Sequence, residues 1–377
     1  MSLDPVNGGG SVERTLQMSR YLAKSGVECT VVTTDVGLTS DQLEKLQGQG
    51  ADVVVLPTIL KRYYLPRVLY SRIDRIIENV DVIHLVNHWT LLNALVFQRA
   101  GRLGKPYVVC PAGALPIFGR SKIVKRIYNN IIGKRIIRQA NACVAISPLE
   151  IPDFKVFGVR EDMISVIPNG IDPEEFEQED DKGFRRKYEL PDAPFILFMG
   201  RLNAIKGPDL LLEAFIDVIR SAEGFPYHLV FVGPDGGMLH ELQARSVREG
   251  VENRVHFLGY VGGADKSRAY RAAGLLAIPS RQEAMSIVVL EAGISGTPVL
   301  ITDRCGFDDV AAVGGGMVVG ASVEGLKDGL IGMTADPGAL KSMGRNLEKF
   351  TRDHFLWEDM VNRYLQLFST IIRSGPV

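Results

Sequence analysis

Residues 278 to 299 read IPSRQEAMSIVVLEAGISGTPV. The apolar run that ends at Pro279 predicts a buried parallel strand. After a polar loop, the pattern predicts a helix from about Ser286 that stops before Gly296. The first turn of such a helix presents free backbone N–H groups and the positive end of the helix dipole, which suit a phosphate or another anion. This stretch therefore predicts a strand, loop and helix unit with an anion site at the loop.

Two carboxylates flank the start of the predicted helix, Glu283 in the loop and Glu291 inside the helix. Ionised carboxylates accept hydrogen bonds, so ribose or sugar hydroxyls are suitable partners while the helix start holds a charged group. A solvated loop residue and a surface helix residue would have the same spacing. The spacing alone leaves both interpretations open.

The composition limits the classes of protein to consider. A chain of 377 residues exceeds one ordinary core and fits two domains. Hydrophobic residues make up 46% and charged residues 23%, as in soluble globular proteins. A net charge of −1 argues against a general nucleic-acid binder. No segment has the apolar length of a membrane span and no signal peptide opens the chain, so a cytoplasmic protein is expected.

No metal site is predicted. The four cysteines are widely separated and form no C-x-x-C pair, which indicates buried thiols in a reducing compartment. His84 and His88 are four residues apart on a predicted strand, where side chains at that spacing do not converge as they do on a helix.

The first half of the chain alternates predicted helices with apolar strands. Apolar rather than alternating strands indicate a parallel, doubly wound sheet, in which ligands lie beyond the carboxyl ends of the strands. His88 is on that side. The predicted strands are 27–33, 53–56, 81–86, 106–110, 142–146 and 164–167, with helices at 67–79 and in the region up to 139.

Three glycines, residues 8 to 10, precede an amphipathic helix at the start of the chain. Glycines at such a place let the backbone approach a ligand closely. A flexible tail is an equally good interpretation of these residues.

The second half repeats the strand and helix alternation after a linker at 171–194, which carries an acidic run, a basic cluster and prolines. We expect an N-terminal domain at 1–180, a C-terminal domain at 190–354, and a last helix within 355–377 that packs back on the first domain. The predicted strands of the second domain are 195–199, 228–232, 255–258, 275–278 and 298–301.

Two cations follow the first strand of the second domain. Arg201 lies directly after the strand and Lys206 just before the next helix. Arg by bidentate hydrogen bonds and Lys as a point charge suit a diphosphate, although a pair of solvated basic residues is the common alternative. The turns at 233–237 and 259–261 and the stretch 283–291 are predicted at the same sheet edge, and this convergence favours a ligand site.

Four segments of the chain resemble the retaining glycosyltransferases of family four. The segments are VIPNGID at 166–172, GRLNAIKG at 200–207, VHFLGYV at 255–261 and the stretch 279–299. The resemblance implies the GT-B fold, in which two doubly wound, Rossmann-like domains face each other across a cleft. It also implies that the N-terminal domain binds the acceptor and the C-terminal domain binds the nucleotide-sugar donor.

The resemblance assigns roles to individual residues. Arg201 and Lys206 would bind the nucleotide diphosphate, Glu291 would hold the ribose hydroxyls, and Glu283 would position the donor sugar without acting as a nucleophile. His88 is the candidate for a further contact with that sugar, because the loop after residues 107–110 lacks the histidine that many members carry. The other residues implied in donor binding are Gly9, Gly10, Gly200, Gly233, Tyr260, Val261, Ala284, Met285 and Ser286.

Neither a metal nor a cofactor is implied, because the two cations and the helix start can stabilise the leaving diphosphate. Many members of the family open with a strand before the glycine loop, whereas this sequence begins within the loop. We therefore expect the first sheet to lack its central strand, or the sequence to be truncated.

The acceptor side is predicted from charge. Residues 120–138 contain seven cations, six isoleucines and no acidic residue, and a second basic stretch with aromatic residues lies within 61–75. Basic amphipathic helices bind anionic membranes, which predicts peripheral contact with the cytoplasmic membrane face and a lipid-linked acceptor. A solvated helix whose isoleucines pack inward is the alternative.

The expected function is retaining transfer of a sugar from a UDP- or GDP-sugar to a hydroxyl acceptor, such as a precursor of a cell-envelope polysaccharide or glycolipid. A non-catalytic nucleotide-sugar-binding or scaffold protein and a GT-B nucleotide-sugar epimerase remain alternatives. A nicotinamide dehydrogenase is disfavoured, since the glycine loop lacks a preceding strand and the G-x-G-x-x-G spacing.

Overall fold

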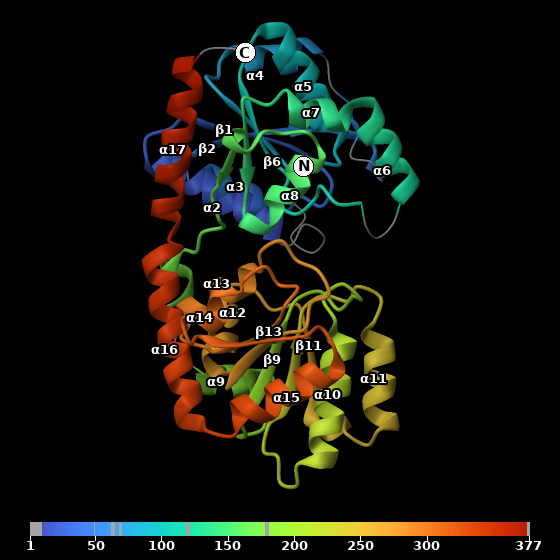
Figure 1. The fold of residues 1–377 in the computed structure, drawn as a ribbon. Coiled ribbons are helices and arrows are strands. Elements are labelled where there is room, and N and C mark those ends of the chain that lie inside the picture. Colours follow the sequence, from blue (N-terminus) through green and yellow to red (C-terminus); the bar gives the residue numbers. More distant parts are fainter. Residues whose placement is uncertain are drawn as a thin grey trace. The chain divides into compact units, whose positions relative to one another are not determined.

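The computed structural model describes residues 10–48, 50–61, 65–67, 70–117, 121–177 and 181–374 (Figure 1). Contacts divide the chain into two compact units. Unit 1 comprises Met1–Gly170 with Trp357–Val377, and unit 2 comprises Ile171–Leu356. Both units place parallel strands between helices, which confirms the predicted α/β class. None of the helices in the described ranges combines the length and the apolar character that crossing a bilayer would require.

Unit 2 contains one six-stranded parallel sheet with the order β11-β10-β9-β12-β13-β14. From β9 the chain builds outward through β10 and β11, then returns to place β12 on the other side of β9. Such a reversal is the topological switch point at which parallel sheets bind ligands. The strands are β9 Phe195–Met199, β10 His228–Val232, β11 Val255–Gly259, β12 Leu275–Ile278, β13 Val299–Thr302 and β14 Gly316–Val319.

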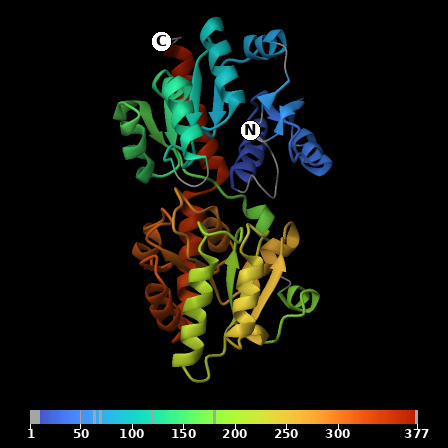
Figure 2. The same ribbon diagram turned by 90° about the vertical axis from the view of Figure 1, so that its right-hand side faces the viewer.

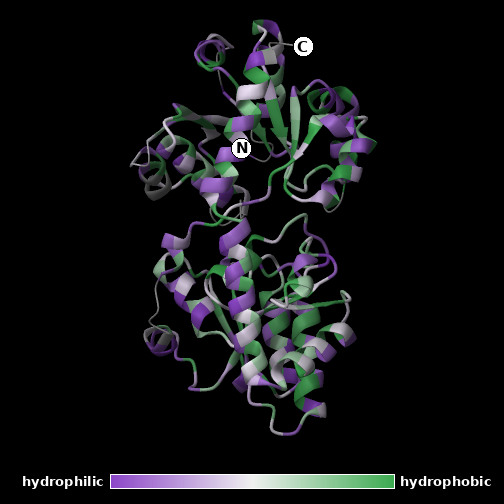
Figure 3. Ribbon diagram, turned by 60° about the vertical axis from the view of Figure 1, so that its left-hand side comes forward, coloured by the Kyte–Doolittle hydropathy of each residue, from purple (hydrophilic) through white to green (hydrophobic). Residues whose placement is uncertain are grey.

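Helices cover both faces of this sheet (Figure 2). The core under α10, α11 and α15 contains Phe215, Phe231 and Leu330, while α12, α13 and α16 pack against one another in series. Apolar residues concentrate in the strands and polar residues on the outer helices (Figure 3). The helices are α9 Asp181–Lys187, α10 Pro208–Ser221, α11 Leu239–Arg248, α12 Ala264–Ala272, α13 Ile287–Ile294, α14 Asp309–Ala312, α15 Val323–Thr334 and α16 Pro337–His354.

The parallel strands of unit 1 form two sheets among the described residues. β1 pairs with β2, and β5, β6, β7 and β8 form a second sheet in that order. Among the described residues no strand pairing joins these two sheets, whereas a doubly wound domain has one continuous sheet. The strands are β1 Cys29–Thr34, β2 Ala51–Leu56, β5 Ile83–Val86, β6 Tyr107–Cys110, β7 Ala142–Ala145 and β8 Ile164–Val166, with a short antiparallel pair of β3 Thr58–Leu60 and β4 Leu65–Pro66.

Local sequence sets both ends of one helix of unit 1, whereas the helix predicted at 67–79 is shorter, at Tyr70–Glu78. In α5, Thr90 caps the first turn by accepting the N–H of Asn93, and Gly104 ends the helix in the left-handed conformation at φ 63°. The helices are α2 Gly10–Lys24, α3 Ser40–Gly48, α4 Tyr70–Glu78, α5 Leu91–Leu103, α6 Lys122–Tyr128, α7 Lys134–Arg138, α8 Ile151–Val156 and α17 Trp357–Ser374. One π-helical turn, Asn129–Gly133, joins α6 to α7.

The last helix, α17, packs against α2, the first helix in the described part of unit 1. Arg14 of α2 is 2% exposed, donates from Nη1 to the Cys110 sulfur at 2.7 Å, and donates from Nη2 to the Tyr364 hydroxyl of α17. The Tyr364 ring lies 5.5 Å from the His84 ring of β5. A buried polar cluster thus joins α2 and α17 to the sheet.

Candidate functional site

Three loops meet at the carboxyl edge of the unit 2 sheet, beside the switch point between β9 and β12. They are residues 200–207 after β9, 279–286 after β12 and 303–308 after β13. The Arg281 N–H donates to the Ile205 carbonyl at 2.7 Å, which joins the first loop to the second. The second loop is joined to the third where the Glu283 N–H donates to the Arg304 carbonyl at 2.8 Å.

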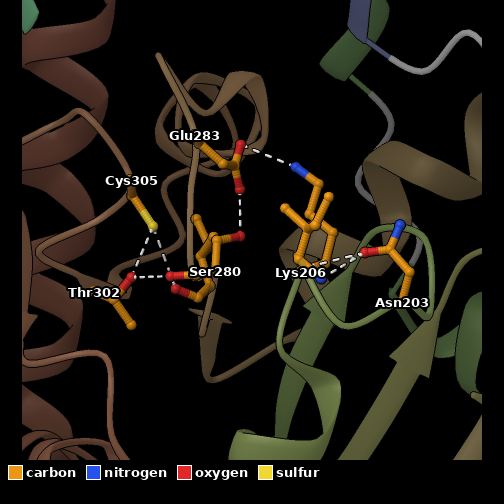
Figure 4. A network of polar contacts seen from close by, with 8 residues as sticks. Asn203, Lys206, Ser280, Glu283, Thr302 and Cys305 are labelled. Carbon is orange, nitrogen blue, oxygen red and sulfur yellow. Dashed lines mark hydrogen bonds and ion pairs between the residues drawn. The ribbon is translucent and has the colours of Figure 1, made fainter. Parts of the chain in front are cut away.

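An ion pair between Lys206 and Glu283 links the side chains of the first two loops (Figure 4). The Lys206 Nζ lies 2.9 Å from the Glu283 Oε2, and the Ser280 hydroxyl donates to the other carboxylate oxygen. The Glu283 side chain is 10% exposed, so it needs these partners, because an unpaired charge away from water is costly. Lys206 is 35% exposed and has three N–H donors, which allows it to bind a second anion.

The local sequence holds Lys206 in place. The Asn203 side-chain oxygen accepts the backbone N–H groups of Ile205 and Lys206, each at 3.0 Å, which closes a tight turn. Gly207 follows in the left-handed conformation at φ 68°, and a Cβ there would lie 2.1 Å from the Pro279 carbonyl oxygen. Only glycine allows the first and second loops to approach this closely.

Residues at the ends of β12 and β13 support the Glu283 loop (Figure 4). The Thr302 hydroxyl donates to the Ser280 carbonyl at 2.5 Å, and the Cys305 thiol donates to the Ile278 carbonyl at 3.4 Å. Burial raises the pKa of Cys305 to about 12, so this thiol stays protonated at neutral pH. It therefore supports the loop and is no thiolate nucleophile.

The start of α13 carries a buried hydroxyl without a hydrogen-bond partner. Ser286 precedes the helix and is fully buried, and among the described residues no group bonds to its Oγ. Ala284, in the same loop, lies close to Gly306. A Cβ added to Gly306 would lie 2.2 Å from the Ala284 carbonyl oxygen. An unpaired hydroxyl beside the free N–H groups of a helix start favours a polar ligand at this place.

Glu291 lies in a different environment from Glu283. Its side chain is 4% exposed, its Oε1 lies 2.5 Å from the Lys266 Nζ, and its Oε2 accepts the Tyr270 hydroxyl at 2.6 Å. Burial and the Glu291 charge raise the pKa of Tyr270, so its hydroxyl remains a donor. The predicted contact of Glu291 with ribose stays a prediction, and a nucleotide would have to share or displace these partners from α12.

The glycine turns predicted in the site lie at the same edge. Gly200 donates its N–H to the Val232 carbonyl at 2.8 Å, and Gly233 donates to the Gly259 carbonyl at 2.7 Å. A Cβ on Gly233 would lie 1.9 Å from the Gly200 carbonyl oxygen. The other predicted contacts at this edge are Arg201, which is partly exposed, Tyr260, which is 61% exposed, Val261, which is buried, and Met285, which is buried.

The remaining predicted residues belong to unit 1. Gly9 lies outside the described residues, and Gly10 is the first residue of α2. His88 is 1% exposed, and its Nε2 lies 2.8 Å from the Asn129 Oδ1. Three aromatic rings, those of Trp89, Tyr128 and Phe157, pack edge-on against the imidazole. Its contact with a donor sugar stays a prediction, and the ring would have to leave this enclosure to make it.

The burial of His88 predicts a pH dependence of stability. Burial lowers the pKa of His88 to about 4, against about 6.5 in an unfolded chain, although the Asn129 hydrogen bond opposes the shift. The unfolded state therefore binds the proton first, and stability is lost as the pH falls from 6.5 toward 4. Between pH 7 and pH 5 we expect the free energy of unfolding of the wild type to fall by about 2 kcal/mol more than that of a His88→Gln variant.

Urea unfolding of both proteins at the two pH values measures this difference. His84 is also buried, and its pKa is lowered to about 3, but it is present in both proteins and cancels. Equal losses in wild type and variant would show that the imidazole is not held neutral by its surroundings.

Sequence reasoning did not identify several residues of the site. Ser280 follows the apolar strand β12, and Thr302 is the last residue of β13. A polar residue at the carboxyl end of a buried parallel strand was the signal in the sequence that could have identified them. The other unidentified residues are Asn203, Lys266, Tyr270 and Arg304. In the part of the chain that the structure describes, no three His, Cys, Asp or Glu side chains gather closely enough to hold a metal ion.

Comparison with known proteins gives two family matches that together cover most of the chain. Residues 8–175 match Glycosyltransferase Family 4, and residues 180–350 match Glycosyl transferases group 1. The chain is 32% identical over 219 residues, 56% of its length, to a D-inositol 3-phosphate glycosyltransferase of Nocardia farcinica. The chain spans about half the length of the first curated relatives that it matches, 49% in this one.

A second relative aligns over more of the chain. The D-inositol 3-phosphate glycosyltransferase of Actinosynnema mirum is 29% identical over 382 residues, which cover 93% of this chain and 90% of that protein. Among solved structures, the Anabaena protein HepE in complex with UDP and glucose superposes with a TM-score of 0.80 at 18% identity, covering 97% of this chain and 98% of HepE. With a parallel α/β fold in both units, these matches show that the chain belongs to glycosyltransferase family 4 and has the GT-B fold.

Proposed function

We propose that this protein transfers a sugar from a nucleotide-sugar donor to a hydroxyl acceptor with retention of configuration. The observation that carries the proposal is the Lys206–Glu283 pair, which lies in the loops at the switch point and near the start of α13. The unpaired Ser286 hydroxyl at that helix start supports it, as does membership of the family. In this proposal unit 2 binds the donor and unit 1 binds the acceptor.

The cations and the helix start would stabilise the leaving group. Lys206 and Arg201 would contact the diphosphate, and the N–H groups at Ala284 to Ser286 would contact the donor sugar or the phosphates. Preorganised donors of this kind contribute about 2 to 4 kcal/mol each to stabilising the transition state in a site that excludes water. Glu283 would orient Lys206 and the sugar.

The reaction proposed is a front-face substitution. The bond between the anomeric carbon and the phosphate oxygen breaks, and a bond from the acceptor oxygen forms on the same face of the sugar. The departing phosphate oxygen takes the acceptor proton, so no protein nucleophile is needed. The neutral Cys305 thiol and the paired Glu283 carboxylate agree with that requirement.

The donor and acceptor are proposed by class. UDP-sugars come first and GDP-sugars second, since HepE, which has a similar fold, was solved with UDP and glucose. The relatives named D-inositol 3-phosphate glycosyltransferases place small phosphorylated polyols among the hydroxyl acceptors to test. A lipid-linked hydroxyl acceptor is the other class.

A ligand panel tests the function. Thermal unfolding is measured with UDP, GDP and ADP and with their sugars, followed by release of free nucleotide from the sugars that bind. At a concentration of 100 Kd the matching nucleotide stabilises by about 2.7 kcal/mol, which for a unit of this size raises the melting temperature by roughly 5 to 10 °C. No shift with any nucleotide would overturn the proposal, whereas binding without release under any acceptor would favour the binding-protein alternative.

Two variants separate the roles of the glutamates. Glu291→Ala is expected mainly to weaken nucleotide binding, and Glu283→Ala mainly to slow turnover. The Glu283 variant, purified in parallel, also controls for a contaminating hydrolase. Small and equal effects of both variants would assign the two carboxylates to the structure of unit 2 alone.

A further inference from the structure

The helical segment of residues 122–138 exposes a row of aliphatic side chains. Ile123 is 71% exposed, Ile127 is 52% exposed and Ile131 is 67% exposed. They are four residues apart, so they share one side of the helix. None of the side chains of α6 is buried, and only Ile136 and Ile137 of α7 are fully packed inward. The alternative that all the isoleucines of this segment pack inward is therefore wrong.

Exposed cations accompany this row. We call the whole set the basic apolar face, and it consists of Lys122, Ile123, Val124, Arg126, Ile127, Ile131, Lys134, Arg135 and Arg138. Arg120 lies outside the described residues, and so do several residues of the second basic stretch, 61–75.

The charge around this face is one-sided over a long stretch of sequence. Residues 82–149 contain ten of the 43 Lys and Arg residues and none of the 44 Asp and Glu residues. No carboxylate within the segment can therefore neutralise these cations, and Arg99, which lies outside the face, pairs with Asp74 from before the segment. Because the whole chain is close to neutral, this concentration of positive charge is local, and an anionic partner fits it.

The face is held firmly to unit 1. The π-helical turn places Asn129 against His88, and the Arg138 Nε donates to the Phe157 carbonyl at 2.6 Å. A Cβ on Gly133 would meet the Asn129 side-chain oxygen at 2.5 Å, so the turn is tightly packed. Figure 1 shows α6 standing out from the body of unit 1. The exposed isoleucines are therefore presented by an ordered part of the fold.

Aliphatic side chains among cations suit the interface of a bilayer. The isoleucines can enter the acyl boundary while Lys and Arg stay at the level of anionic headgroups. Nucleic acid instead selects aromatic and polar side chains beside the cations. The helical segment 122–138 also carries six Lys and Arg residues, which does not suit a segment that crosses a membrane.

We propose that the basic apolar face docks unit 1 on the surface of an anionic lipid bilayer. The docking does not depend on the glycosyl transfer proposed above. Together with that function it gives the acceptor a class, a hydroxyl on a lipid or on a lipid-linked saccharide held at the same surface.

Flotation of the full chain with vesicles tests the docking. We expect binding at 50 mM NaCl to vesicles with 30% phosphatidylglycerol in phosphatidylcholine, little binding to pure phosphatidylcholine, and weaker binding at 500 mM NaCl. Ile127→Ser with Ile131→Ser should lower the partition coefficient at least tenfold, and Lys122→Gln with Arg126→Gln should lower it by a similar factor. Val247→Ser, at a 63% exposed valine of unit 2, and Lys341→Gln are the matched controls and should not change it.

Each outcome decides the proposal. No flotation of the wild type on the anionic vesicles at 50 mM NaCl overturns it. Flotation that is unchanged by the isoleucine substitutions also overturns it, because charge alone would then account for the binding to vesicles. Melting temperatures of the variants check folding, and nucleotide release from a soluble donor is measured in parallel. Loss of flotation with intact release separates a failure of docking from a failure of the proposed function.

Discussion

Replacing Lys206 with alanine is expected to lower kcat by about 10²- to 10³-fold, the effect of removing one preorganised donor from a developing negative charge. The substitution also leaves Glu283, whose side chain is 10% exposed, with the Ser280 hydroxyl but without its cation. An unpaired carboxylate beside the proposed diphosphate would repel it. Nucleotide released per unit time, from the donor that the ligand panel selects, measures the loss.

The ion pair predicts that the effects of its two partners are not additive. Glu283→Gln in the Lys206→Ala background removes the unpaired charge. The double variant should therefore be about tenfold more active than the product of the two single effects predicts. Lys341→Ala, at an exposed lysine of α16 in the same unit, is the matched control and should leave kcat unchanged. A loss of less than fivefold in Lys206→Ala would remove Lys206 from the leaving-group site.

The second large loss, of both turnover and stability, is expected from Gly207→Ala. Gly207 has φ 68°, and the added Cβ would lie 2.1 Å from the Pro279 carbonyl oxygen, well inside any normal contact. The 200–207 and 279–286 loops would have to separate by about 1 Å, which moves Lys206 away from Glu283. Misplacement on this scale can lower turnover about 10²-fold. The strain should also lower the free energy of unfolding by about 2 to 4 kcal/mol.

Gly224→Ala is the matched control for this variant. Gly224 is also in unit 2 and has φ 75°, but a Cβ there would meet no atom within 4 Å. It should therefore lose only about 1 kcal/mol, the cost of a left-handed alanine. Thermal unfolding should place the Gly207 variant roughly 5 to 10 °C below the Gly224 variant. Equal melting temperatures would mean that the two loops separate without strain.

The sequence predicted the local elements of the site well. The strand and helix expected around residues 278–296 are β12 and α13, and the helix starts within one residue of the predicted Ser286. Buried parallel strands are continuous apolar runs, and helix limits are set by a few neighbouring residues, so both signals are local. Because parallel strands end at one edge, the same reasoning also placed Lys206 and Glu283 on the same side of the sheet.

The partners of each charged residue were not predictable in this way. Glu283 and Glu291 looked alike as two carboxylates at a helix start. In the structure Glu283 pairs with Lys206, 77 positions earlier in the sequence, and Glu291 is held by Lys266 and Tyr270 of α12. His88 looked available at a strand end, but aromatic rings and Asn129 enclose it. Such partners come from distant segments, which only packing brings together.

The sequence by itself determined the class of the fold, most of its parallel strands and the glycines that its tight loops require, because each follows from a run of neighbouring residues. The edge strand β14, Gly316–Val319, was not predicted. The tertiary structure alone decided which carboxylate meets which cation. It also decided that Ile123, Ile127 and Ile131 are exposed while Ile136 and Ile137 are buried. Helical periodicity places all of these isoleucines on a helix but does not say which side meets the core. That choice depends on which residues of the segment pack against the rest of unit 1, as Ile136 and Ile137 do.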